Sequence, residues 1–126
     1  MRAVDTNVLV RLATRDDAKQ VAVAETYITG GAWISLLALA EMAWVLDVAY
    51  ARTPSAIAAL IGVVLDHENL AVQHADVAVA ALEQYRRKPA LGFSDCLILE
   101  IGRKAGHLPL GTFDRDLARL EGAERL

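Results

Sequence analysis

The chain has 126 residues, of which 55% are hydrophobic, and contains 8 Gly and 3 Pro. This length suits one domain spanning residues 1–126, and the composition is too apolar for a disordered chain. The formal net charge of −3 argues against binding of nucleic acid through a generally basic surface. A polyanionic substrate would therefore need a local binding site.

Two further features restrict the class of protein. No apolar run approaches the roughly 18–20 uncharged residues of a membrane span, and Asp5 and Arg11 interrupt the segment where a signal peptide needs an apolar core. We therefore expect a cytoplasmic protein that does not contact a membrane. Cys96 is the only cysteine, which excludes an internal disulfide and a cysteine-cluster zinc site, and its apolar neighbours predict a buried position.

The first half of the chain alternates short strand-like runs with longer helical ones. In chain order it predicts a strand over 2–4, helices over 7–13 and 18–29, a strand over 32–34, and helices over 36–50 and 54–65. Asp17, Ser35 and Thr53 are the predicted N-caps of the last three helices, and Gly30-Gly31 ends the helix that Asp17 begins. The last two helices are expected to form a helical hairpin.

The second half continues the same alternation. It predicts a strand over 70–72, helices over 76–87 and 95–105, a strand over 108–112, a short helix over 114–120, and a last strand or frayed end over 123–126. Ser94 is the predicted N-cap of the helix over 95–105, and Gly106 ends that helix. Alternation of this kind is typical of βαβ units. It predicts an α/β fold with a central, mainly parallel sheet of four or five strands flanked by helices.

Glu41 is the only charged residue in the segment 36–46 of an otherwise apolar predicted helix. Such a helix should be mostly buried. A buried carboxylate without a partner costs several kcal/mol. We therefore expect Glu41 to be protonated, paired with a cation or bound to a metal ion, unless its face of the helix reaches solvent.

Three further acids, Asp5, Asp95 and Asp114, lie at junctions between predicted elements. A structural role explains each one alone, because an acid in a turn or in the first turn of a helix bonds backbone N–H groups and is favoured by the helix dipole. Asp116 has the same explanation. The alternative is that these acids meet, because the carboxyl ends of parallel strands share one edge of a sheet, where ligand sites form.

Glu41 can reach the same edge if its helix is tilted, since it lies about 9 Å along that helix. Carboxylates brought together repel one another unless they share a proton, meet an arginine or hold a divalent cation. Carboxylate oxygens are hard ligands and favour Mg²⁺ or Mn²⁺ over zinc.

At this point the chain resembles a known family, the PIN domains. The resemblance rests on Val4-Asp5-Thr6-Asn7, on Glu41 in the helix after the second strand, on Gly92-Phe93-Ser94-Asp95 and on Thr112-Phe113-Asp114. It covers nearly the whole chain and implies a three-layer sandwich. Within the PIN domains, the size of the chain is similar to that of VapC-type toxin ribonucleases of toxin–antitoxin pairs.

The resemblance implies a metal-dependent endoribonuclease that cleaves single-stranded or loop regions of RNA. Asp5, Glu41, Asp95 and Asp114 would be its catalytic residues and would hold one or two Mg²⁺ or Mn²⁺ ions. A metal held in this way can lower the pKa of a bound water and stabilise charge at the phosphate, so no protein nucleophile is needed. The resemblance also implies self-association, with the helix over 36–50 contributing to a homodimer, and an antitoxin protein that covers the site.

Other residues have candidate roles around this centre. Asn7, Thr112 and Asp116 are candidates to orient the acids or a metal-bound water, although turn formation explains them equally well. The candidates for binding the phosphates that flank the cut are Arg11, Arg86, Arg87, Lys88 and Arg115. Arg86, Arg87 and Lys88 are also explained as cations that favour the C-terminus of a helix.

Two rival functions remain open at the level of sequence. One is a phosphatase with an aspartyl nucleophile, but that chemistry commonly shows a second acid two residues after the first, and Asp5 is followed by Thr6-Asn7. The other is a PIN-like binding module without catalysis, against which the complete set of acids argues.

Overall fold

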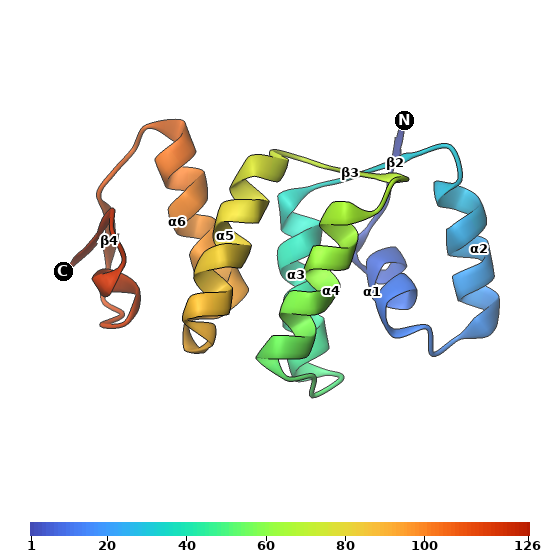
Figure 1. Cartoon of the computed structure of the whole chain (residues 1–126), viewed down its shortest axis with the longest axis horizontal. Helices are drawn as coiled ribbons and strands as arrows, with labels where there is room; N and C mark the ends of the chain where they lie inside the picture. Colours follow the sequence, from blue (N-terminus) through green and yellow to red (C-terminus); the bar gives the residue numbers. More distant parts are fainter. The chain divides into compact units, whose positions relative to one another are not determined.

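Helices form the connections between the strands of this protein, and all of its strand pairs are parallel. The computed structural model describes residues 1–126 and divides into two compact units, Met1–Ala75 and Asp76–Leu126. In chain order the elements (Figure 1), with η marking 3-10 helices, are β1 (Arg2–Ala3), α1 (Thr6–Thr14), α2 (Ala18–Ile28), β2 (Ala32–Ile34), α3 (Leu36–Val48), α4 (Pro54–Asp66), β3 (Leu70–Val72), α5 (Ala75–Arg87), η1 (Pro89–Leu91), α6 (Phe93–Ala105), β4 (Leu110–Thr112), η2 (Leu117–Arg119) and β5 (Ala123–Arg125).

The N-terminal unit contains a three-stranded parallel sheet in the order β1-β2-β3. Ala32 of β2 pairs with Arg2 of β1 and with Leu70 of β3. Helices α1 and α2 lead from β1 to β2, and α3 and α4 lead from β2 to β3, which are the long crossovers that parallel strands require. Helices α3 and α4 pack against each other, so the predicted helical hairpin is confirmed.

The helices of this unit begin where their capping residues predict. Asp17, Ser35 and Thr53 each accept, through a side-chain oxygen, the backbone N–H of the residue three positions later, at 3.0–3.1 Å. Each such cap contributes about 1 kcal/mol. Together they fix the starts of α2, α3 and α4.

The core of the N-terminal unit is built from the inner faces of α1, α3 and α4. Leu9, Leu39, Met42, Leu46 and Ile61 are fully buried there. Burial of each such side chain contributes about 1.5–3 kcal/mol. This packing holds in place the start of α1 and the middle of α3, which carry candidate site residues.

Helix α3, which was expected to be mostly buried, exposes one face. Leu37, Trp44 and Val48 are 61–69% exposed and lie with Glu41 on one face, at helical spacing. The opposite face is buried. The helix therefore exposes an apolar stripe, here called the α3 stripe, with one carboxylate in it.

The C-terminal unit contains α5, α6 and a two-stranded parallel sheet in which Leu110 of β4 pairs with Ala123 of β5. The ring of Tyr85 in α5 meets the ring of Phe93 in α6 edge to face, with centroids 6.0 Å apart. The predicted burial of Cys96 is confirmed, because its side chain is 0% exposed.

The start of α6 was predicted two positions too late, at residue 95 instead of Phe93. Ser94 does not cap this helix; it lies inside it, and Gly92 occupies the cap position without any side-chain hydrogen bond. Gly92 has φ = +80°, a left-handed conformation that glycine adopts more readily than other residues. The predicted stop at Gly106, whose φ is +83°, is confirmed.

The last elements are shorter than predicted. Strand β4 begins at Leu110 rather than at residue 108, because Pro109 has no N–H for a strand ladder. The helix predicted over 114–120 is reduced to the 3-10 turn η2, while the optional last strand is present as β5.

The predicted α/β fold with parallel strands is confirmed, and six α-helices accompany the strands. The five strands are divided between a sheet of three and a sheet of two. None of the helices combines the length and the apolar character needed to cross a membrane. The assignment of residues 1–126 to a single domain stays a prediction.

Candidate active site

Asp5 lies between β1 and α1, where the backbone is held from both sides. The N–H of Val4 donates to the carbonyl of Trp33 in β2 at 3.1 Å. Asp5 is the N-cap of α1, and its Oδ1 accepts the N–H of Val8 at 3.2 Å. The structural role expected for Asp5 is therefore present, but it uses one carboxylate oxygen only. Oδ2 makes no hydrogen bond within the unit and is exposed to a ligand.

Glu41 is positioned by a hydroxyl that the sequence analysis did not assign to the site. The Oγ1 of Thr6 donates to Oε2 of Glu41 at 2.8 Å. Thr6 directly follows Asp5, so this bond brings Glu41 of α3 next to the start of α1. The only signal in the sequence was a hydroxyl residue beside the candidate acid.

The exposure of Glu41 contradicts the burial argument that made it a candidate metal ligand. Its side chain is exposed on the α3 stripe, so no penalty for burying a charge forces it to bind a cation. Glu41 remains a candidate because of its position beside Thr6 and Asp5, and not because of burial.

Asp95 lies in the first turn of α6, as expected, and is half-buried. Burial raises the pKa of its carboxyl above the ordinary value, and the negative charge of Asp114 raises that pKa further. The helix N-terminus would act in the opposite direction. Asp114 therefore lies close enough to Asp95 to disfavour the charged form of Asp95, which is a condition that a cation relieves.

Asp114 lies in the tight loop after β4. Its Oδ1 accepts the N–H groups of Asp116 and Leu117 at 2.8 and 3.0 Å, so the predicted structural role, in which the acid bonds backbone N–H groups, is confirmed. The N-cap position of η2 is Asp116, which makes no side-chain capping bond. The N–H of Asp114 donates to Oγ1 of Thr112 at 3.0 Å. As with Asp5, one carboxylate oxygen holds the backbone, and Oδ2 makes no hydrogen bond within the unit.

The structure thus groups the four acids as two pairs: Thr6, the residue after Asp5, bonds to Glu41 in the N-terminal unit, and Asp114 acts on the charge of Asp95 in the C-terminal unit. Neither unit by itself brings together three or more His, Cys, Asp or Glu side chains that could hold a metal ion. The donors fit Mg²⁺ or Mn²⁺ in kind, because all four are hard carboxylate oxygens. Convergence of all four acids stays a prediction.

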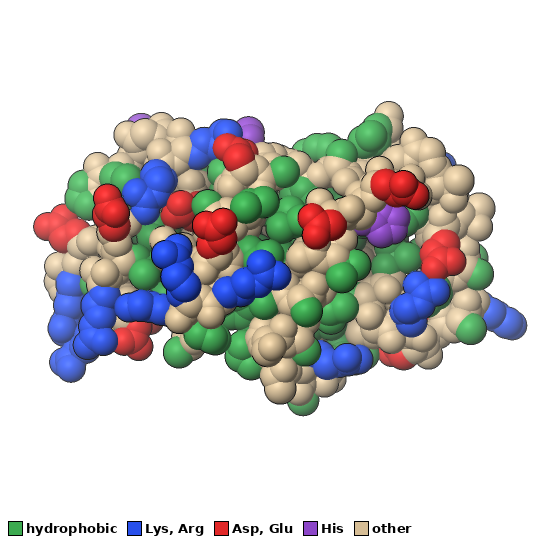
Figure 2. Space-filling view, viewed as in Figure 1, with side chains coloured by type: hydrophobic (Ala, Val, Ile, Leu, Met, Phe, Trp, Pro, Cys, Tyr) green, Lys and Arg blue, Asp and Glu red, His purple; other side chains and the backbone are tan.

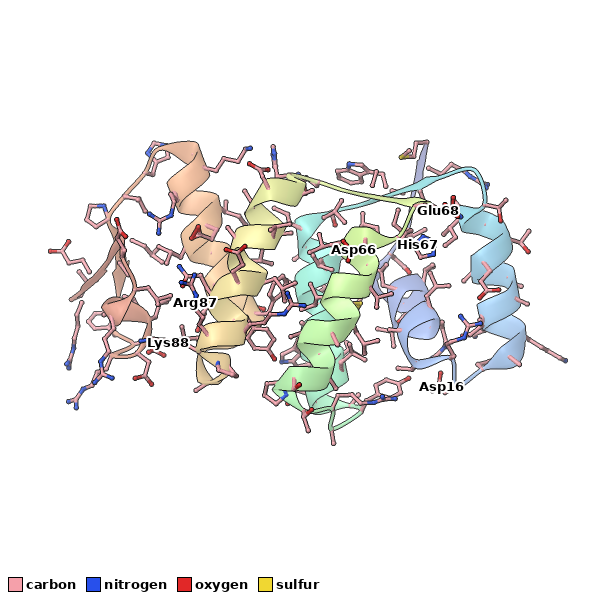
Figure 3. All side chains as sticks on the ribbon, viewed as in Figure 1. Asp16, Asp66, His67, Glu68, Arg87 and Lys88 are labelled. Carbon is pink, nitrogen blue, oxygen red and sulfur yellow. The ribbon has the colours of Figure 1, made fainter.

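Arg11 makes contacts that hold it within the N-terminal unit. Its guanidinium donates to Oε1 of Gln20, to the hydroxyl of Tyr50 at 2.9 Å and to Oδ1 of Asp16 at 3.4 Å. The Tyr50 hydroxyl also donates to Asp16, which lies in the α1–α2 connection (Figure 3). These bonds tie α1 to the end of α3, so binding of a phosphate by Arg11 would have to compete with them.

The other candidate phosphate ligands lie in the C-terminal unit and are exposed. Arg86, Arg87 and Lys88 end helix α5, and Figure 3 shows the last two of them there. These cations therefore also lie where positive charge interacts favourably with the C-terminus of a helix. Arg115 is exposed directly after Asp114. On the face drawn in Figure 2, Lys and Arg side chains gather over this unit.

The residues expected to orient the acids differ in their contacts. Thr112 accepts the backbone N–H of Asp114, so it supports the loop that carries this acid. Asp116 forms an exposed ion pair with Arg119 at 3.7 Å. Asn7 is exposed and lies with Asp5 in the lining of a cavity of about 580 Å³ between β1, α1 and α2. The remaining lining of that cavity is mostly apolar.

One of the three comparisons with known proteins identifies a family. The profile of the PIN domain family matches residues 2–123. The chain belongs to the PIN domain family. No curated protein and no solved structure gives a significant match. PIN domains are generally nucleases, and PIN nucleases generally use divalent metal ions. The PIN resemblance of the sequence is thereby confirmed, while the assignment to VapC-type toxins within the PIN domains stays a prediction.

Proposed function

We propose that this PIN domain is a metal-dependent endoribonuclease in which Asp5, Glu41, Asp95 and Asp114 hold one or two Mg²⁺ or Mn²⁺ ions. The observation that carries the proposal is the arrangement of the four acids as two pairs. Asp5 and Asp114 each use one oxygen to fix their own backbone and keep the other available. The proposed centre takes one acidic pair from each half of the sequence.

The protein's own groups position these acids. The hydrogen bonds from backbone N–H groups to Asp5 and Asp114 hold one oxygen of each carboxylate, at the start of α1 and in the loop before η2, and Thr6 holds Glu41. When bound, Mg²⁺ or Mn²⁺ supplies Lewis-acid chemistry, which lowers the pKa of a bound water and stabilises charge on the phosphate. The exposed cations Arg86, Arg87, Lys88 and Arg115 bind phosphates of the strand and set its position.

The experiment is cleavage of a labelled single-stranded RNA with added Mg²⁺ or Mn²⁺. We expect scission that stops with a chelator and that falls by roughly 100-fold or more in Asp5→Asn and Asp95→Asn, because each variant loses a carboxylate that holds the metal ion. Asp47→Asn and Glu124→Gln are matched controls, since both acids are exposed and lie outside the proposed centre. These controls should cleave like the parent protein.

The same assay separates the rival functions. Turnover of a generic phosphomonoester without cleavage of RNA would indicate a phosphatase, and absence of both activities would indicate a binding module. Cleavage that persists in Asp95→Asn, in a preparation free of contaminating nuclease, contradicts the proposed centre.

We further propose that the protein is a VapC-type toxin that acts on RNA in the cytoplasm and is inhibited by an antitoxin. The cavity beside Asp5 and Asn7 supports this, because its apolar lining can accept apolar side chains of a partner segment next to the acids. Expression of the chain alone should arrest growth, and expression of Asp5→Asn should not. Equal growth of the two strains, at equal protein levels, contradicts the toxin role.

The α3 stripe supports self-association of the protein into a homodimer. Leu37, Trp44 and Val48 expose apolar side chains on a single helix face, and such a face marks an interaction site. Sedimentation velocity should show a dimer that Trp44→Glu shifts toward monomer. A parent protein that is monomeric at tens of micromolar contradicts this part of the proposal.

A further inference from the structure

Phe113 is an aromatic side chain exposed directly beside a site acid. It is 79% exposed, and the next residue is Asp114. The ring meets no other aromatic ring and no cation within its unit, in contrast to Tyr85 and Phe93, which pack together. No aromatic or cation–π contact within the C-terminal unit therefore accounts for the position of the Phe113 ring.

The loop that carries Phe113 is held on both sides. Before it, the carbonyl of Thr112 accepts the N–H of Leu126 at 2.9 Å, which completes the pairing of β4 with β5. After it, Oδ1 of Asp114 accepts two backbone N–H groups, and Leu117 anchors η2 in the core with 5% exposure. The ring is thus presented from a fixed backbone, so a ligand that contacts it orders little additional chain.

The sequence around Phe113 fits a flat, charged ligand better than a protein surface. Thr112 and Asp114 flank the ring, and Arg115 and Asp116 follow, all of them polar or charged. The cores of protein interfaces are depleted of charged residues. Single-stranded RNA, in contrast, offers an apolar ring face next to an anionic phosphate, and proteins bind such bases by stacking them on aromatic side chains.

We propose that Phe113 is the stacking platform for one unpaired nucleobase of an RNA strand whose phosphate lies at the Asp95 and Asp114 pair. Adjacent Cα atoms are about 3.8 Å apart, so the ring and the carboxylate of Asp114 lie within the span of one nucleotide. Arg115 is placed to bind a neighbouring phosphate. This inference rests on the proposed function and assigns Phe113 to substrate binding and not to chemistry.

The test uses a single-stranded RNA oligonucleotide that carries the fluorescent base 2-aminopurine, with the substitution moved along the strand. Binding is measured in the Asp95→Asn background without added metal ion, so that the strand stays intact and binding does not depend on an ion that this variant holds weakly. We expect quenching of 2-aminopurine at one position, with weaker binding by about 5- to 150-fold and loss of the quenching in Phe113→Ala. Phe113→Tyr should keep both, and Phe113→Leu should resemble Phe113→Ala.

Several outcomes overturn the proposal. Unchanged affinity and quenching in Phe113→Ala do so, and so does full rescue by Phe113→Leu, which would show an apolar contact without stacking. Loss of self-association in Phe113→Ala with unchanged RNA binding would assign the ring to a protein surface instead. Because the ring is exposed, we expect Phe113→Ala to keep the unfolding temperature of the parent protein. An unchanged unfolding temperature excludes misfolding as the cause of weaker RNA binding.

The same measurements distinguish this inference from the proposed function. If the parent protein quenches 2-aminopurine but never cleaves RNA, the nuclease proposal fails and the stacking platform stands. If the parent cleaves RNA and Phe113→Ala cleaves it with unchanged KM, the stacking inference alone fails. A parent protein that binds no RNA contradicts both.

Discussion

The hydroxyl group of Thr6, the residue after Asp5, positions the carboxylate of Glu41, which lies 35 residues further along the chain. The bond from Thr6 to Glu41 spans α1 and α3 and leaves Oε1 of Glu41 available. Such supporting bonds orient metal ligands, and their loss typically reduces metal affinity or activity by roughly 10- to 100-fold. Thr6 is therefore a positioning residue of the proposed centre.

We predict that Thr6→Val raises the Mn²⁺ concentration needed for half-maximal cleavage of RNA by roughly 10-fold or more, because Glu41 loses its fixed orientation. Thr6→Ser should restore the parent value, since it keeps the hydroxyl. A merely structural role would lower the free energy of unfolding, by about 1 kcal/mol, without moving the metal dependence. An unchanged metal titration in Thr6→Val contradicts the assignment.

At the scale of elements, helices α5 and α6 are joined by an ion pair between Lys104 Nζ and Asp76 Oδ2 at 2.6 Å. The hydrogen bond from Lys104 lowers the pKa of the Asp76 carboxyl below its ordinary value. Both side chains are partly exposed, so the contribution of the pair to stability is small. The lowered pKa nevertheless determines the direction in which this contribution to stability changes with pH.

A lowered pKa in the folded state means that the pair stabilises the protein above the ordinary aspartate pKa of about 4 and loses this effect as pH falls through the folded value. We predict that Asp76→Asn lowers the free energy of unfolding at pH 7 and that the difference from the parent shrinks below pH of about 4. Urea unfolding at several pH values measures it. A difference that grows on acidification would falsify the role of this pair.

The elements also show what sequence could and could not predict. Asp17, Ser35 and Thr53 predicted helix starts correctly, because a cap depends on the few residues next to it. The start of α6 was predicted wrongly, because Gly92 fixes it through a backbone conformation that no side-chain pattern displays. Exposure of the Glu41 face of α3 stayed an open alternative in the sequence, because apolar residues on all sides of a helix do not reveal which face lacks a partner.

For the site, the sequence predicted the four acids by residue type and position but not their contacts. The bond from Thr6 to Glu41 joins residues distant in the chain, and only the fold brings them together. The network around Arg11, which includes Gln20 and Tyr50, was missed for the same reason. Burial was the wrong argument for Glu41, although the residue itself remains part of the proposed centre.

At the scale of the whole molecule, the proposed centre makes stability depend on metal. A ligand that binds only the folded state stabilises it by about 2.7 kcal/mol when its concentration is 100 times its Kd. We predict that Mn²⁺ raises the Tm of the parent protein by several degrees, in a chelator-sensitive way. Differential scanning fluorimetry measures this rise without any nuclease assay.

The rise should be strongly reduced in Asp5→Asn and in Asp95→Asn alike, since one centre is proposed to use acids from both halves of the sequence. Asp47→Asn serves as the control with an exposed acid outside the centre. A full rise in either site variant would show that its acid does not take part in holding the ion.

The backbone at Gly92 has a consequence for how the protein tolerates change. An added Cβ at this position would meet no atom within 4 Å, so a bulkier residue has ample room. The obstacle is torsional only, because a backbone with φ = +80° and ψ = 147° costs residues other than glycine roughly 1–3 kcal/mol. Asp95 lies three residues after Gly92, in the first turn of α6. Gly92→Ala would therefore change the backbone conformation at the start of this helix, and with it the direction of the Asp95 carboxylate, without any steric clash.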